Sequence, residues 1–208
     1  MHHEASKGTS QASRCIGIGI DDGPFPSKID DSPRYAPLVA VWLKGPHLQR
    51  IKTSRITVDG LDGTLTALRL LKGPIAIPVL LSGVTFGGFN LVDPWKIQQV
   101  SKAPTIVVIG SRPNNASVKR ALSRHFDDWK ERWDLLKSLG PLHKLRTIPK
   151  ENPIFFEKFG CSTREAELIL KQCALVSRVP EPLRVAGLVA RGLFSPEPLD
   201  QPFSYRLL

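Results

Sequence analysis

The chain has 208 residues, enough for one domain with a full hydrophobic core and a helical extension. Its formal net charge of +10 favours polyanionic partners, of which nucleic acid is the most common, although a merely solvated basic surface is the alternative. Ordinary charged and apolar fractions exclude wholesale disorder. Because no apolar run is long enough to cross a bilayer, we expect a cytoplasmic protein without a membrane partner.

The cysteines and histidines form no recognisable metal site. The three cysteines are scattered, with neither zinc-ligand spacing nor a disulfide framework. Cys15 opens an apolar strand and Cys173 lies on the apolar face of a predicted helix, so we expect both to be small core residues. His47, His125 and His143 show no pairing at helical spacing, which argues against metal binding by histidine.

The first predicted element is a strand. Residues 1–14 are polar and without periodicity, and we expect a disordered tail there. Residues 15–21 then alternate strictly, with isoleucines on one face and Gly17, Gly19 and Asp21 on the other. The glycines predict that another element packs closely on that second face.

Beyond this strand, the chain completes an antiparallel meander and then alternates helices with strands. Pro78 is awkward within the fourth strand because proline cannot donate to a ladder, so the ladder begins after it or the boundary lies elsewhere. Residues 141–160 read as irregular and residues 195–208 as a loosely tied tail. The other predicted strands are 37–43, 49–58, 75–81 and 105–109, and the predicted helices are 64–71, 94–102, 115–139, 163–176 and 183–193.

Three meandering strands, followed by two strands each entered through a helix, match the ribonuclease H-like order. The predicted class is therefore α/β, with a mixed five-stranded sheet, flanking helices and a C-terminal helical extension. We expect a single domain over residues 15–194. Other mixed sheets share this order, so topology alone is weak evidence.

Acidic residues stand at the ends of several predicted strands. Asp21 and Asp22 end the first strand, Asp59 ends the third, and Asp62 opens the helix that follows. Neighbouring strand ends form the ligand crevice of open α/β sheets, and carboxylates gathered there bind Mg²⁺. Two such ions stabilise the attacking and leaving oxygens of a phosphodiester displacement. The ordinary alternative is a turn at Asp22 and helix caps at Asp59, Asp62 or Asp93.

Three sequence blocks stand out, and they are Gly19–Phe25, Thr57–Asp62 and Gly83–Asn90. They resemble the archaeal endonuclease dU family, and the similarity runs over about residues 15–194. That family is similar to endonuclease V, which nicks DNA or RNA near deaminated bases with a metal cluster on a ribonuclease H-like core. The resemblance implies a hydrolase of DNA repair that uses Mg²⁺ or Mn²⁺ to nick DNA at deaminated bases, with deoxyuridine as one candidate.

The resemblance also implies roles for single residues. Asp21 matches the first-strand metal ligand and Asp59 the second acidic ligand, with Asp22 and Asp62 as further catalytic candidates. A third aspartate is expected just before the glycine loop, where this chain has Ser82. Either Asp22, Asp62 or Asp93 replaces that ligand, or this member has lost activity. Candidates that line the substrate pocket are Ser82, Gly83, Thr85, Phe86, Gly87, Gly88 and Asn90.

Two alternatives to the nuclease hypothesis stay open. One is a non-enzymatic nucleic-acid-binding protein on the same fold, and the other is an interaction or structural protein whose basic surface serves solubility. Ser82 is the feature that separates the nuclease from the non-enzymatic binder. The candidates for a basic face around Asp21 are Arg55, Lys96, Lys102 and Arg112.

Overall fold

The structure is a computed structural model that describes residues 14–27, 32–72, 75 and 77–193. Both expected tails, apart from Arg14, lie outside the described residues. No helix within the described part of the chain is long and apolar enough to span a membrane.

A seven-stranded mixed sheet forms the centre of the molecule, in the order β3-β2-β1-β4-β7-β9-β8. The first strand is antiparallel to the second and parallel to the fourth, which is parallel to β7. The ribonuclease H-like order predicted for the first five strands is thus confirmed. The strands are β1 (Ile16–Asp22), β2 (Tyr35–Lys44), β3 (His47–Thr57), β4 (Val79–Leu81), β7 (Thr105–Ile109), β8 (His143–Leu145) and β9 (Ile154–Phe159).

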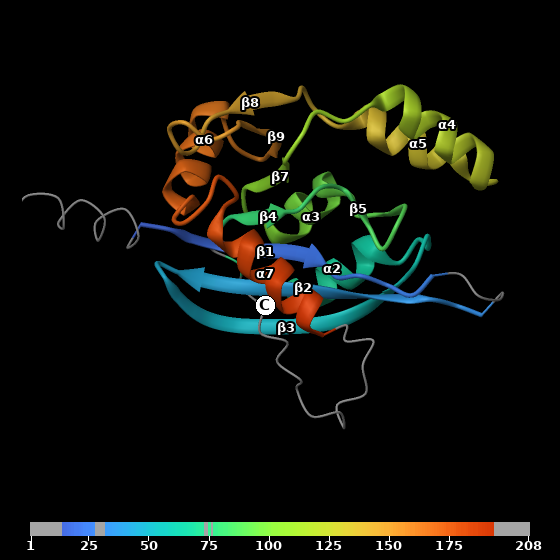
Figure 1. The fold of residues 1–208 in the computed structure, drawn as a ribbon, viewed down its shortest axis with the longest axis horizontal. Helices are drawn as coiled ribbons and strands as arrows, with labels where there is room; N and C mark the ends of the chain where they lie inside the picture. The colour runs from blue at the N-terminus through green and yellow to red at the C-terminus, as the bar shows by residue number, and fades with distance from the viewer. Residues whose placement is uncertain (1–13, 28–31, 73–74, 76, 194–208) are drawn as a thin grey trace, which may run out of the picture.

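Helices cover both faces of this sheet. In Figure 1, α7 crosses the near face in front of β1 and β2, while α2 and α3 lie behind the sheet. The pair α4–α5 stands beyond one end of the strands, close to a small hairpin of β5 (Thr85–Phe86) and β6 (Asn90–Leu91). The helices are α2 (Gly63–Leu71), α3 (Pro94–Ser101), α4 (Asn115–His125), α5 (Trp129–Ser138), α6 (Thr163–Cys173) and α7 (Glu181–Gly192).

Three expectations for the elements are wrong. The sheet has two more strands than predicted, because β8 and β9 lie within residues 141–160 and pair with each other and with β7. The single helix expected over 115–139 is two helices, and Asn114 rather than Asn115 caps the first. Phe126 leaves the helical conformation between them, and its ring lies edge-on to Phe89.

Several local predictions are confirmed. The fourth strand begins after Pro78, whose carbonyl accepts a hydrogen bond from Ile18. The Ser162 hydroxyl caps α6 by accepting from the Glu165 N–H. Cys15 and Cys173 are both buried. These outcomes follow from local rules of proline, capping and burial that need no tertiary information.

The glycine face of β1 is covered by the start of α7, as its composition predicts. A Cβ at Gly19 would overlap the carbonyl group of Pro182 and approach the Leu183 nitrogen. At Gly17 the nearest atom would be Pro182 Cγ at 3.5 Å, an ordinary contact. Gly19 therefore lets the helix backbone rest directly on the strand, and this approach sets the position of α7 over β1.

We expect Gly19→Ala to destabilise the fold by about 3 kcal/mol, because the helix backbone has to move away from the strand. Gly17→Ala is the matched control on the same face of the same strand, and it should be neutral or stabilising by about 0.5 kcal/mol. Urea unfolding of both variants measures the difference. Equal effects of the two substitutions would contradict the close approach at Gly19.

Candidate active site

The site begins with the parallel pairing of β1 and β4. Ile20 stands opposite Leu81, and the Ser82 N–H donates to the Ile20 carbonyl at 3.0 Å. The next residues along the two strands, Asp21 and Ser82, are consequently neighbours at the carboxyl edge of the sheet, and the Ser82 hydroxyl hydrogen-bonds to the Asp21 carboxylate. Ser82 therefore stands directly beside Asp21.

Asp21 is a poorly solvated carboxylate under the C-terminal helix. Burial, and then the negative charge of Asp22, raise its pKa to about 6. A Cβ at Gly187 would lie 2.5 Å from Asp21 Oδ2 and 3.3 Å from the Arg191 guanidinium, so α7 passes directly over the carboxylate. Arg191 stabilises the charged form of Asp21 from a distance. The absence of a side chain at Gly187 leaves the space that Asp21 occupies.

Asp22 supports the glycine loop. Its Oδ2 accepts the Gly87 N–H at 2.6 Å, while burial raises its pKa. Successive residues of a strand point to opposite faces of a sheet, so Asp22 turns away from the α7 face on which Asp21 lies. The two carboxylates that end β1 therefore have different surroundings, one near Ser82 and the other at the loop.

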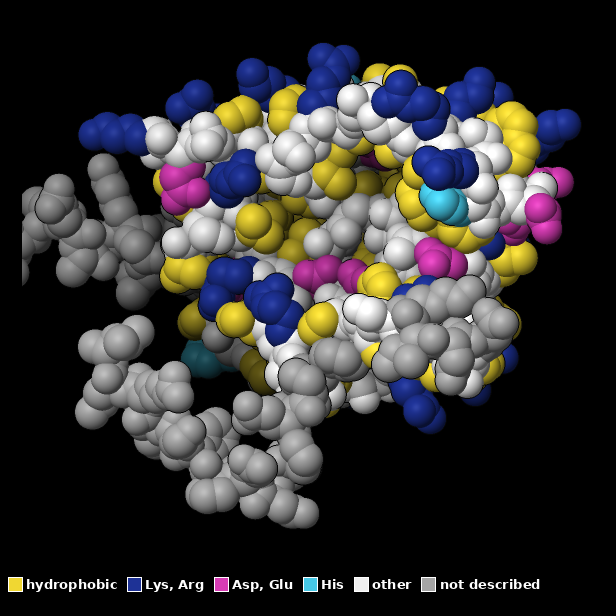
Figure 2. All heavy atoms as spheres, turned by 45° about the vertical axis from the view of Figure 1, so that its right-hand side comes forward, with side chains coloured by type: hydrophobic (Ala, Val, Ile, Leu, Met, Phe, Trp, Pro, Cys, Tyr) yellow, Lys and Arg dark blue, Asp and Glu magenta, His cyan; other side chains and the backbone are white. Residues whose placement is uncertain are grey.

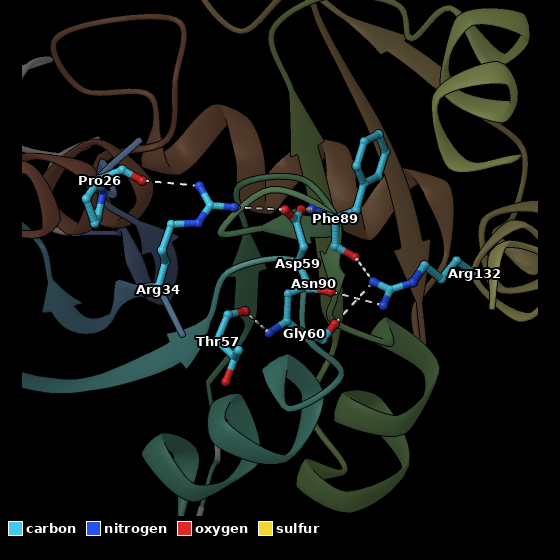
Figure 3. Close-up of polar contacts among 8 residues, drawn as sticks. All are labelled: Pro26, Arg34, Thr57, Asp59, Gly60, Phe89, Asn90 and Arg132. Carbon is cyan, nitrogen blue, oxygen red and sulfur yellow. Dashed lines mark hydrogen bonds and ion pairs between the residues drawn. The ribbon is translucent and has the colours of Figure 1, made fainter. Parts of the chain in front are cut away.

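Asp59 lies on the other side of the same loop. Its backbone has a left-handed conformation (φ 60°), which is uncommon for a residue other than glycine. Its Oδ1 accepts the Phe89 N–H at 2.9 Å, its own N–H donates to the Gly87 carbonyl, and Arg34 lies 3.4 Å from Oδ2 (Figure 3). The Asp59 carboxylate is thus oriented by backbone and by one cation.

Asp62 stabilises the turn between β3 and α2. Its carboxylate accepts from the N–H and hydroxyl of Thr57 and from the Asn90 amide. Asn90, fully buried, also donates to the Thr57 carbonyl and accepts the Gly63 N–H. All of these contacts are internal to the protein, so Asp62 and Asn90 hold the backbone that carries Asp59.

The expected substrate-lining residues divide into two groups. Gly83, Gly87 and Gly88 have positive φ values of 92°, 52° and 85°, which gives the loop a shape that residues with side chains rarely adopt. Thr85 is exposed, whereas Phe86 is completely buried in the core. Phe86 therefore supports the loop from beneath. Gly83 and Gly87 are buried as well, so the exposed residues of the loop are Thr85 and Gly88.

The expected metal ligands do not form a complete cation site. Among the residues that the structure describes, no three His, Cys, Asp or Glu side chains gather closely enough to hold a metal ion. Asp22 and Asp59 are engaged by the loop, which leaves Asp21 beside the neutral Ser82. These residues fit one weakly held cation at Asp21 and not the three-carboxylate set that the resemblance implies.

Basic side chains surround this edge of the molecule. Figure 2 shows a hollow with Asp and Glu side chains in its middle and with Lys and Arg above it and to its lower left. Helix α4 carries Lys119, Arg120 and Arg124 without a single acidic residue. The candidates named from the sequence are all exposed, and they are Arg55, Lys96, Lys102 and Arg112. Lys102 comes just before β7, which is parallel to β4 and β1, so it lies at the opposite edge of the sheet from Asp21 and that part of the prediction is wrong.

Four residues of the site were not expected from the sequence. Arg34 and Arg132 contact the turn at Asp59, and Gly187 and Arg191 lie above Asp21. Arg132 falls within a predicted amphipathic helix, where an arginine ordinarily points to solvent. Gly187 was the one residue with a usable signal, because glycine inside a helix costs stability and so indicates close packing.

Comparison with known proteins identifies relatives along nearly the whole chain. A family model described as Endonuclease dU matches residues 13–194. A UPF0215 protein of Methanosarcina acetivorans is 34% identical over 180 residues, which cover 85% of this chain and 89% of the relative. A UPF0215 protein of Methanopyrus kandleri is 35% identical over 181 residues, which cover 85% and 89% of the two chains.

Solved structures share the fold. A protein of unknown function from Archaeoglobus fulgidus is similar with a TM-score of 0.73 and 27% identity, over 86% of this chain and 98% of that one. Endonuclease V of Ciona intestinalis, in complex with a 24mer DNA containing an inosine followed by a ribo-adenosine, has a TM-score of 0.55 and 20% identity, over 90% and 94%. The fold is therefore ribonuclease H-like, as endonuclease V is.

The raised pKa of Asp21 predicts a pH-dependent stability. The folded protein holds this proton up to about pH 6 and the unfolded chain only to its ordinary value of 3.8, so the free energy of unfolding should fall as pH rises between these values. Asp21→Asn cannot ionise and should be more stable than the parent at pH 7, by on the order of 1–2 kcal/mol. Denaturant unfolding from pH 4 to pH 8 in metal-free buffer measures both profiles.

Asp134→Asn is the control, since that side chain is 68% exposed and pairs only with Lys137. It should leave the profile unchanged. Parallel profiles for Asp21→Asn and the parent would contradict the burial of an ionised Asp21.

Proposed function

This chain belongs to the endonuclease dU family, and we propose that it nicks DNA at deaminated bases, deoxyuridine among them, with one divalent cation at Asp21. The observation that carries the proposal is the half-buried Asp21 carboxylate beside Ser82, at the edge shared by β1 and β4. A buried carboxylate with a raised pKa is typical of a functional site and is unfavourable for stability.

The chemistry follows from the charge of the substrate. A bound Mg²⁺ or Mn²⁺ supplies an activated water and neutralises charge on the phosphodiester. Asp21 is the proposed ligand, the Asp59 carboxylate faces the same edge, and Arg191 lies above Asp21. Repulsion between Asp21 and Asp22 favours cation binding, since a cation relieves it.

The glycine loop is the proposed base pocket. A side chain at Gly88 would overlap the Asp59 carboxylate, and one at Gly87 would press on Ala36 and Ile56. The two glycines, both with positive φ, therefore let the loop pack closely against Asp59 and the core. Asp22 and Asp59 hold the loop from its two sides through the Gly87 and Phe89 N–H groups. The inosine-containing DNA bound to the endonuclease V structure of similar fold supports a deaminated base as the substrate.

A non-enzymatic nucleic-acid-binding protein is the second candidate. Ser82 is neutral, and the described residues gather fewer than three metal-ligating side chains. Both observations favour a member of the family that binds nucleic acid without cleaving it. The two candidates make opposite predictions for substitutions at Ser82 and Asp21.

We expect Ser82→Asp to bind Mn²⁺ about tenfold more tightly than the parent and to nick faster, because a second carboxylate then stands beside Asp21. Asp21→Asn should abolish nicking. Titration calorimetry with MnCl₂ and a nicking assay on oligonucleotides bearing uracil, hypoxanthine or xanthine measure the two effects. If both variants leave metal affinity and nicking as in the parent, the non-enzymatic candidate becomes the better one.

DNA binding should weaken steeply with salt, because each phosphate contact releases counterions. Replacing Arg120 and Arg124 on α4 by glutamine should reduce the slope of log K against log salt by roughly 2. The double variant Lys44→Gln and Arg50→Gln removes the same charge near the end of the sheet that lies away from Asp21, and it should leave the slope unchanged. Fluorescence anisotropy with a labelled duplex distinguishes the two pairs, and equal slopes would exclude α4 from the interface.

A further inference from the structure

Arg132 on α5 is a buried arginine whose guanidinium reaches into the site. Arg132 is 5% exposed. Its guanidinium lies over the Phe126 ring, with the guanidinium carbon 4.4 Å from the ring centre. Its Nε donates to Asp128 at 2.8 Å, one turn earlier. The other two nitrogens point away from the helix and toward the loops around Asp59 (Figure 3).

Those two nitrogens bind backbone carbonyls of two separate segments. One donates to the Asp59 carbonyl at 3.0 Å, and the other to the carbonyls of Gly60 at 3.1 Å and Phe89 at 2.6 Å. A planar guanidinium can make these contacts together, whereas the point charge of a lysine cannot. One side chain therefore joins the turn after β3 to the glycine loop.

The hydrogen bond that orients the Asp59 side chain joins the same two segments. The Phe89 N–H donates to the Asp59 carboxylate, while Arg132 holds the Phe89 carbonyl and the Asp59 carbonyl. The Asp59 backbone is in the left-handed region, which costs about 1 kcal/mol for such a residue and persists only where surrounding contacts enforce it. Arg132 supplies such contacts on both sides.

We propose that Arg132 is the positioning residue for Asp59: it fixes the turn and the glycine loop relative to each other, so that the Asp59 carboxylate keeps its hold on the Phe89 N–H and the loop keeps its place in the site. This inference rests on the proposed function. Arg132 touches no reacting group, and its effect passes through the backbone of Asp59 and Phe89. It also makes the placement of α5 a condition for the geometry of the site.

The competing explanation is that Arg132 only anchors α5 to the rest of the protein. Arg178 offers a matched control, because it also donates to carbonyls of two separate segments, Gly110 at 3.0 Å and Pro153 at 2.8 Å, without contacting the turn at Asp59. A purely structural role predicts the same consequences for Arg132→Met and Arg178→Met. A positioning role predicts that only the first alters the site.

The experiment compares Arg132→Met, Arg132→Lys and Arg178→Met at a temperature well below the melting point of each. Amide hydrogen exchange by NMR follows the N–H groups of Asp59 and Phe89, with those of β7 as the internal reference. Steady-state nicking of a deoxyuridine-containing duplex gives kcat and KM.

For Arg132→Met we expect protection of the Asp59 and Phe89 amides to fall while β7 is unchanged, and kcat to fall about tenfold to a hundredfold with KM within about twofold. Arg132→Lys should lose nearly as much, and Arg178→Met should change neither the two amides nor kcat. Unchanged amides in Arg132→Met, or an equal kcat loss in Arg178→Met, would overturn the inference. If the parent does not nick, the proposed function fails, and the amide exchange still decides whether Arg132 positions Asp59.

Discussion

The parallel pairing of β1 with β4 is the constraint on which the site depends. Because both strands run the same way and Ile20 stands opposite Leu81, the residues that follow this pair, Asp21 and Ser82, arrive at the same edge. β3 runs in the same direction as β1, through two antiparallel pairings, so Asp59 arrives there as well. Everything else in the site, including the loop contacts and the cover by α7, acts on residues that this sheet order has already gathered.

The site holds the Asp21 carboxylate in surroundings that disfavour its charged form, which lowers the stability of the folded protein. Asp21 is kept poorly solvated next to Asp22, with a helix passing over it, and the backbone N–H that donates to its carboxylate is that of its own neighbour Asp22, at 3.0 Å. Asp22, Asp59 and Asp62, by contrast, accept from groups in other parts of the site: the Gly87 N–H, the Phe89 N–H and the Asn90 amide. Such a difference between neighbouring carboxylates is how proteins separate supporting groups from groups available to a ligand.

The sequence predicted the elements with strong local signals and the edge at which the acids meet. Alternation in β1, the start of β4 after Pro78 and the cap at Ser162 depend on local physics, so they were predictable. The break at Phe126 was not, because the residue leaves the helix for a ring contact with Phe89, distant in sequence. β9 was missed because its residues pair with β7, and that pairing depends on the completed sheet rather than on local pattern.

The candidate site shows the same division. The neighbourhood of Asp21 and Ser82 followed from strand order, whereas the separate engagements of Asp22 and Asp59 depend on the conformation of the glycine loop. The role of Arg132 could not be predicted from the sequence, because helical spacing places it among ordinary polar positions. Its burial is apparent only in the tertiary structure. The role of Asp62 changed for a similar reason, since Asn90 is its partner only once the hairpin of β5 and β6 has formed.

The position of Gly187 over Asp21 has a consequence for biosynthesis. Among the described residues, Asp21 lies on the first strand to be synthesised, and the helix that covers it is the last element to appear. During translation the glycine face of β1 therefore stays open while the rest of the sheet assembles, since domains complete their packing only when the contributing segments have emerged. The hollow around Asp21 acquires its final shape only near the end of synthesis, so a nascent chain that stops before α7 carries the acidic residues without the assembled site.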